Sequence, residues 1–169
     1  MSPCSRLSAG PRQALLRISG LSRHDWALLL GALILLPLVS AGLRLFGLRR
    51  VLVLIAAIPA ARRCVVADGV RGATRTAWLV DVAARGLWPR PACLAKAVVV
   101  SSLLRRRGRA AQLVVGVAKT GGTLEGHAWV ELGGAAVGAS HGLARYAVLA
   151  RIPDRPPDLA TFLRAERTP

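Results

Sequence analysis

The sequence predicts an α+β fold, in which a helix carrying a cysteine is followed by antiparallel strands carrying a histidine. Two segments lead to this prediction. The segment from Cys93 to Arg107 contains no Gly or Pro, and Gly108 follows it as a typical helix end. The segment from His127 to Leu132 has the alternating pattern of a half-buried strand. A chain of 169 residues is long enough for one such domain with an appendage.

Cys93 stands in the opening turn of the predicted helix, after the proline-rich connection from Leu87 to Pro91. At the N-terminus of a helix, the dipole and the free N–H groups stabilise a thiolate, and this lowers the pKa of a cysteine. A free cysteine is often only a small buried residue, so the helix alone leaves a structural role open. We expect Trp88 of the connection to pack either beside the thiol or in the core.

His127 opens a strand of a predicted antiparallel sheet. The β-branched run over 113–117 predicts a buried strand before it, 119–123 predicts a turn, and 135–138 predicts a third strand after a second glycine-rich turn. A lone histidine on a strand is more often structural than catalytic. A histidine that follows a cysteine helix in this order has the chemistry of a thiol–imidazole pair, in which the imidazole holds and returns the thiol proton.

A longer pattern surrounds these two residues: Cys93-Leu94-x-Lys96-Ala97, an arginine-rich helix end before Gly108, and the block Gly126-His127-Ala128-Trp129-Val130-Glu131-Leu132-x-Gly134. This pattern resembles the transglutaminase-like proteases of lasso-peptide biosynthesis, strongly from about Trp78 to Val137 and more loosely over Leu21 to Arg50. The resemblance implies a transglutaminase-like, papain-like cysteine protease core with Cys93 and His127 as catalytic residues.

A third catalytic residue cannot be carried over from this resemblance. Family members have an acidic residue, typically Asp, on the strand after the histidine, and Ala139 stands at about that position here. No Asp or Glu occurs between Glu131 and Asp154. The candidates to orient His127 are therefore Ser140, Glu131 and the distant Asp154.

Ser140 is the first of these candidates because of the expected strand register. If Gly133-Gly134 forms a two-residue hairpin turn, Leu132 lies opposite Ala135 and Val130 opposite Val137. Continuing this register places His127 opposite Ser140, whose hydroxyl could accept the imidazole N–H. Glu131 ranks second, since it shares the face of His127 but is two pleats away.

The N-terminal part is expected to differ from the rest. Residues 1–20 read as a disordered N-terminus, 21–66 as a hydrophobic helical region, and 67–169 as the protease domain. Ser22 with Asp25 predicts a helix start close to a capping box. The run from Trp26 to Leu43 has no charged residue, and Pro37 is expected to interrupt it. This length is marginal for a membrane span, so we expect the run to pack on the protease domain or on a partner protein.

Composition limits the partners and the compartment. The chain has 24 Lys and Arg residues against 8 Asp and Glu, which gives a net charge of +16 and attraction to acidic partners. The pattern of a single-stranded nucleic-acid platform is not seen, so we expect no nucleic-acid partner. Cys4, Cys64 and Cys93 are odd in number and widely spaced. This favours a reducing cytoplasm and excludes the spacing of a zinc site.

The sequence thus predicts a cysteine peptidase that needs no metal or organic cofactor. The resemblance implies that it removes the leader from a lasso-peptide precursor. The implied partners are that precursor peptide, a separate leader-recognition protein and an asparagine-synthetase-like cyclase that closes the ring. Two alternatives remain open: a transglutaminase-like acyl transferase, and a non-catalytic membrane-associated scaffold of the maturation complex. We expect a cytoplasmic protein, with peripheral membrane association as the variant that the apolar run suggests.

Overall fold

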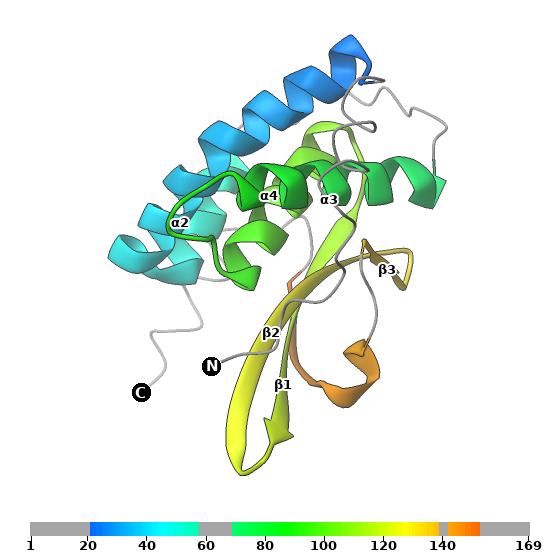
Figure 1. Ribbon diagram of the computed structural model, residues 1–169. Helices are drawn as coiled ribbons and strands as arrows, with labels where there is room; N and C mark the ends of the chain where they lie inside the picture. Colours follow the sequence, from blue (N-terminus) through cyan, green and yellow to red (C-terminus); the bar gives the residue numbers. More distant parts are fainter. Residues whose placement is uncertain (1–20, 58–68, 139–141, 153–169) are drawn as a thin grey trace.

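The computed structural model describes residues 21–57, 69–138 and 142–152 (Figure 1). Its helices are α2 (Arg23–Ala57), α3 (Gly69–Arg85) and α4 (Cys93–Arg106). Its strands are β1 (Ala111–Thr120), β2 (Thr123–Leu132), β3 (Ala135–Val137) and β4 (Ala147–Ile152), with a short 3-10 turn at Leu143–Arg145. This is the predicted α+β arrangement of helices followed by strands. The expected disordered N-terminus and the expected domain boundary at residues 66 and 67 lie outside the described residues.

The strands form one antiparallel sheet in the order β3-β2-β1-β4. Gly133 and Gly134 both have positive φ, 59° and 82°, as a tight hairpin turn requires. The predicted register of this hairpin is confirmed, because Val130 lies opposite Val137 and Leu132 lies opposite Ala135. β3 pairs with β2 only over these last positions. Within the described residues, the part of β2 around His127 therefore lies at the edge of the sheet.

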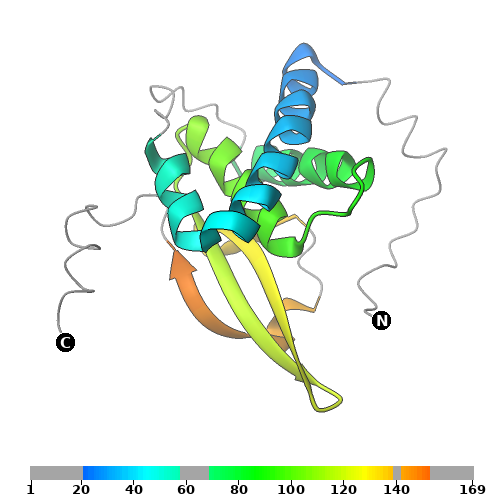
Figure 2. The ribbon, with the colours of Figure 1, turned by 90° about the vertical axis from the view of Figure 1, so that its left-hand side faces the viewer.

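The three helices lie together on one side of the sheet, and the β1–β2 hairpin extends beyond them (Figure 2). Alternation along the strands gives the sheet two different faces. Leu113, Ala128 and Val130 face the helices and join the main core with Val98 and Leu104 of α4. The other face carries a smaller buried cluster, made of Val114, Ala118, Trp129 and Tyr146.

α2 forms the outer layer, on α3 and α4. Its backbone keeps helical angles through Pro37, and the break lies instead at Gly47, where φ is 75° and ψ is 169°. The expected interruption at Pro37 is therefore wrong. The helix breaks at Gly47 because only glycine adopts the conformation found there without strain. Further along α2, Arg105 of α4 donates to the carbonyl of Ile55. This contact ties the second part of α2 to α4.

The two sides of α2 differ in burial rather than in polarity. Its buried side chains pack inward: Leu28, Leu29, Ala32, Leu36, Val39 and Val51. Its exposed side is also apolar: Trp26, Leu30, Ile34 and Leu38 are 45–63% exposed. By length and composition alone, α2 could cross a membrane. One side of this helix nevertheless serves as core for α3 and α4.

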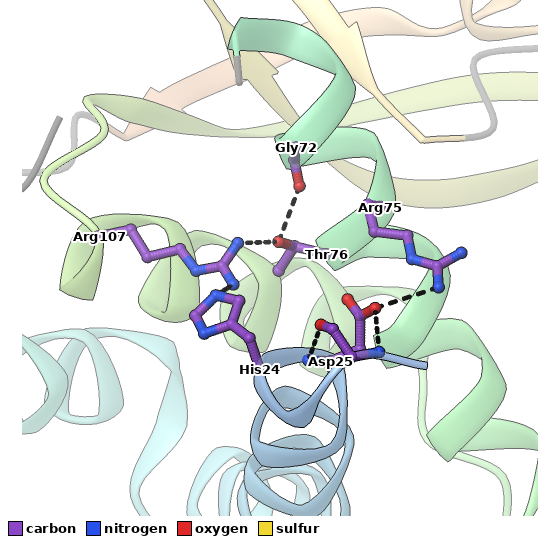
Figure 3. A network of polar contacts seen from close by, with 7 residues as sticks. His24, Asp25, Gly72, Arg75, Thr76 and Arg107 are labelled. Carbon is purple, nitrogen blue, oxygen red and sulfur yellow. Dashed lines mark hydrogen bonds and ion pairs between the residues drawn. The ribbon is translucent and has the colours of Figure 1, made fainter. Parts of the chain in front are cut away.

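The start of α2 is capped as predicted. The Ser22 hydroxyl accepts a hydrogen bond from the Asp25 N–H at 3.1 Å, and the Asp25 carboxylate accepts one from the Ser22 N–H at 3.2 Å. This is a reciprocal capping box with Asp in the acidic position. The same carboxylate also binds Arg75 of α3 at 3.2 Å (Figure 3). The cap therefore begins α2 and joins it to α3.

Thr76 is the polar centre of the helical layer. It is fully buried, and its hydroxyl donates to the Gly72 carbonyl at 3.0 Å. The hydroxyl also accepts from Arg107 at 3.1 Å, and Arg107 in turn contacts His24 (Figure 3). One buried hydroxyl thus connects α3 with the end of α4 and, through Arg107, with the start of α2.

We expect Thr76→Val to lower the free energy of unfolding by about 1–2 kcal/mol. Valine keeps the shape of the side chain but cannot accept from Arg107 in a buried site. Urea denaturation of the purified protein measures this change. Thr74→Val is the matched control, because Thr74 is an exposed threonine of the same helix, and it should change stability by less than ~0.5 kcal/mol. Equal stability of the two variants would contradict the bridging role of Thr76.

Candidate active site

The structure brings Cys93 and His127 together. Cys93 is the first residue of α4, and Ala92 before it has extended backbone angles and makes no side-chain cap. His127 comes from the edge region of β2. The His127 imidazole and the backbone N–H groups of Leu94 and Ala128 lie close enough to the Cys93 sulfur to lower the pKa of its thiol by hydrogen bonding. The sulfur therefore faces donors from the helix start and from the strand at once.

These contacts change the acidity of the thiol. The hydrogen bond from His127 lowers the pKa of Cys93 below its ordinary value, against the desolvation by burial, which raises it. The N–H groups of Ala128 and Leu94 and the charge of the imidazolium lower this pKa further. A thiolate is the reactive form of cysteine. Cys93 is thus in the environment expected of a nucleophile rather than that of an inert core residue.

Packing of α4 holds Cys93 at this place. Val98 and Val99 are fully buried, so the helix cannot rotate without exposing them. Near the thiol, Lys96 binds Asp81 of α3 at 3.1 Å, and Arg85 binds the same carboxylate at 2.8 Å. Burial raises the pKa of Asp81, but these two cations lower it more, so the net shift is downward. The first turn of α4 is thereby joined to α3 by charge as well as by core contacts.

His127 is held by aromatic side chains. Its ring stacks on Tyr146 at a centroid distance of 5.1 Å and on Trp129 at 6.2 Å. Trp129 fits because Gly116 lies opposite His127 on β1: a Cβ at Gly116 would come within 2.9 Å of the indole ring. Sequence reasoning did not find Tyr146 or Gly116. A glycine inside the predicted strand over 113–117 was the available signal, since such a glycine often marks close approach of another group.

Glu131, the second-ranked partner for His127, is engaged elsewhere. One carboxylate oxygen accepts from the Trp129 indole N–H at 3.0 Å, and the other binds Arg151 of β4. Glu131 is buried in this arrangement. Its carboxylate therefore positions Trp129, which in turn contacts the imidazole.

Several other predicted positions lie outside the described residues. These are Ala139, Ser140 and Asp154 of the third-residue hypotheses, and the two remaining cysteines, Cys4 and Cys64. The expected pairing of Ser140 with His127 stays a prediction for this reason. Trp88 is described, and both expectations for it are wrong: its side chain is 93% exposed. The short connection before α4 directs it to solvent beside the helix start instead of into the core.

Comparison with known proteins agrees with this geometry. Residues 34–151 match the transglutaminase-like superfamily. The chain belongs to that superfamily. Its members usually have cysteine-protease or acyltransferase activity. No curated protein and no solved structure matches the chain. The match extends from within α2 to β4, so much of the apolar N-terminal helix belongs to the matched region.

The pair is arranged for thiol chemistry, and its acidity can be tested without a substrate. We expect His127→Asn to slow alkylation of Cys93 by iodoacetamide near neutral pH. Without the imidazole, the pKa of Cys93 rises toward its ordinary value and the thiolate forms only at higher pH. Peptide-resolved mass spectrometry across a pH series measures the rate at this cysteine alone.

His24→Asn is the control for this experiment. His24 lies at the start of α2 and contacts Arg107, away from the thiol. Its replacement should leave the pH dependence of Cys93 alkylation unchanged. An unchanged profile in His127→Asn would show that the imidazole does not set the acidity of this thiol.

Proposed function

We propose that the protein is a cysteine peptidase that removes the leader from a ribosomally made lasso-peptide precursor. One observation carries the peptidase part: Cys93 at a helix N-terminus lies beside His127, whose imidazole lowers the pKa of the thiol, in a chain of the transglutaminase-like superfamily. The substrate part rests on the sequence resemblance around these two residues. The proposed localisation is the cytoplasm.

The proposed reaction has two stages. The Cys93 thiolate attacks the carbonyl carbon at the leader–core junction, forming a C–S bond. As the C–N bond breaks, His127 gives its proton to the leaving amine, which leaves a thioester on Cys93. His127 then takes a proton from water, the hydroxide attacks the thioester carbonyl, and the thiolate is released. Backbone N–H groups at the start of α4, including that of Cys93, are suited to stabilise the oxyanion of each stage.

An acyl transferase would use the same first stage. The thioester would then be attacked by an amine instead of water, and the superfamily includes such activity. The choice depends on what reaches the thioester, so product analysis with and without an added amine discriminates the two. A non-catalytic scaffold is the remaining alternative. If the protein is a scaffold, replacing Cys93 and His127 would leave its function intact.

The partners follow from the proposed pathway. The substrate would be presented by a separate leader-recognition protein, and an asparagine-synthetase-like cyclase would close the ring on the released core peptide. The net charge of +16 favours contacts with acidic segments in these partners. Genes for a short precursor and for such a cyclase beside the gene for this protein would support this pathway.

We expect Cys93→Ala to abolish leader release, because no other group in the proposed reaction forms the thioester. Mass spectrometry of the precursor after incubation with the purified enzyme and its partners measures cleavage. Cys4→Ala and Cys64→Ala are matched controls and should retain activity within a few-fold. Cleavage by Cys93→Ala at the wild-type rate would refute the thiol mechanism.

We also propose that α2 stays packed on the protease domain and does not span a bilayer. Its buried side contacts α3 and α4, and α3 carries Arg71, Arg75, Asp81 and Arg85 along its length. A spanning α2 would have to leave these helices or draw their charges into hydrocarbon, which is costly. Its exposed apolar side is compatible with peripheral association at a membrane surface.

This arrangement predicts that carbonate washing releases the protein from any membrane fraction of the cell. High pH removes peripheral proteins, whereas a bilayer-spanning protein stays in the pellet. Immunoblotting of supernatant and pellet gives the result, with an integral membrane protein as the internal control. Full retention in the carbonate-resistant pellet would overturn the packed arrangement of α2 in cells.

A further inference from the structure

The imidazole of His127 is one corner of an aromatic triangle. The ring centroids of His127, Trp129 and Tyr146 are 6.2, 5.1 and 6.4 Å apart, and His127 is stacked on both partners, with interplanar angles of 22° and 27°. The three ring centres therefore form a triangle, and the imidazole is not sandwiched between the other two rings. Tyr146 is its nearer partner.

Tyr146 is itself fixed from several directions. Its backbone N–H donates to the Leu143 carbonyl at 3.0 Å, at the end of the 3-10 turn. Its hydroxyl accepts from Arg145 at 2.7 Å, and the Arg145 guanidinium also lies over the phenol ring at 4.9 Å. The side chain is buried. Arg145 reaches back to Glu125 of β2, two residues before His127, at 3.5 Å.

The sheet is shaped to admit this ring. The pairing of β1 with β4 shifts register between Val115 and Gly116, which pair with Ala150 and Val148, so that Leu149 of β4 has no partner on β1. Gly116 pairs with His127 on one side and with Val148 on the other. The irregularity therefore lies across β1 from His127, at Leu149, three residues after Tyr146. Such irregularities commonly direct a side chain next to an active site.

We propose that Tyr146 is the positioning residue of the catalytic histidine: its ring holds the imidazole plane so that a ring nitrogen stays directed at the Cys93 sulfur. The inference rests on the proposed function in so far as the pair performs thiol chemistry. In catalytic triads this orienting role belongs to a hydrogen-bonded carboxylate.

The groups around the imidazole come from four elements. Within the described residues, Cys93 of α4 and Tyr146 lie against His127, and the charged groups that contact its aromatic partners are Arg145, on Tyr146, and Glu131 of β2, which binds Trp129. Arg151 of β4 binds Glu131. Glu125 binds Arg145. Tyr146 is the one of these that offers a flat face to the imidazole.

The test compares Tyr146→Phe with Tyr146→Leu. Phenylalanine keeps the stacked face and loses only the hydroxyl, whereas leucine fills the buried site without a π face. Tyr146→Leu should slow Cys93 alkylation near neutral pH by about tenfold or more, the effect of one pKa unit on the thiolate fraction, and should move its pH profile upward. Tyr146→Phe should stay within about threefold of the wild type, a change below half a pKa unit.

Precursor cleavage provides the second readout. Tyr146→Leu should lower kcat and leave KM nearly unchanged, because Tyr146 orients the base and is not assigned to substrate binding. Leu124→Ala is the control, since Leu124 is a 73% exposed apolar residue near the turn of the β1–β2 hairpin, and both of its readouts should match the wild type. A Tyr146→Leu variant that folds and alkylates with the wild-type pH profile would overturn the inference.

One further measurement keeps the outcome decisive. If Tyr146→Leu does not fold by circular dichroism, NMR of the wild type decides instead: ring protons of His127 must show nuclear Overhauser effects to the ring protons of Tyr146, and their absence refutes the inference. Alkylation needs no substrate, so it also separates the two proposals. Absence of cleavage with a Tyr146-dependent alkylation profile would refute only the peptidase function.

Discussion

Packing of α4 against the sheet is the constraint on which the candidate site depends. The thiol and the imidazole come from different elements, 34 residues apart in the chain, and only the docking of helix on sheet brings them into contact. Val98 and Leu104 are fully buried at that junction. The main core thus has two effects, because the same contacts that exclude water from it also hold the Cys93 sulfur beside the edge of β2.

β2 shows how one strand can serve a core and a site together. Its alternate residues Ala128 and Val130 belong to the core beneath the helices, while His127, Trp129 and Glu131 form a chain of contacts on the opposite face. Because the period of a strand is two, a slip by one residue would exchange these sets. Core burial therefore also specifies which face His127 occupies, and the hydrogen bond that the Trp129 indole N–H donates to Glu131 fixes the indole next to it.

Local signals in the sequence predicted much of this arrangement. The helix from Cys93, the capping box at Ser22 and the Gly133-Gly134 hairpin register depend on neighbouring residues, and the structure has all of them. The strand that carries His127 is also present, but it begins at Thr123 and not at His127, because the turn before it contains only Gly121 and Gly122. The predictions that were wrong depended on contacts between residues distant in sequence, or on local rules that packing can override. Pro37 was expected to interrupt α2, but tertiary packing carries the helix past it, and the break needed the positive φ of Gly47.

Tyr146 and Gly116 could not be found in this way. Tyr146 is 19 residues from His127 in sequence, and nothing in its own neighbourhood indicates a contact with an imidazole. The contact depends on an irregularity in the pairing of β1 with β4, which no pattern along a single strand reveals. The predictions for Trp88 were wrong for a related reason. Its burial depends on the path of the connection before α4, and the docking of α3 and α4 sets that path.

Gly116 makes the reactivity of the site depend on a position that contacts no reacting atom. The hydrogen atoms on its α-carbon are what leave room for the indole of Trp129. A methyl group there would displace the indole, and the imidazole stacked on it would lose one of its two supports. A substitution at Gly116 of β1, which contacts no reacting atom, would thus change the environment of the Cys93 sulfur on α4. Sequence variation at this glycine should accordingly be accompanied by a smaller residue in place of Trp129.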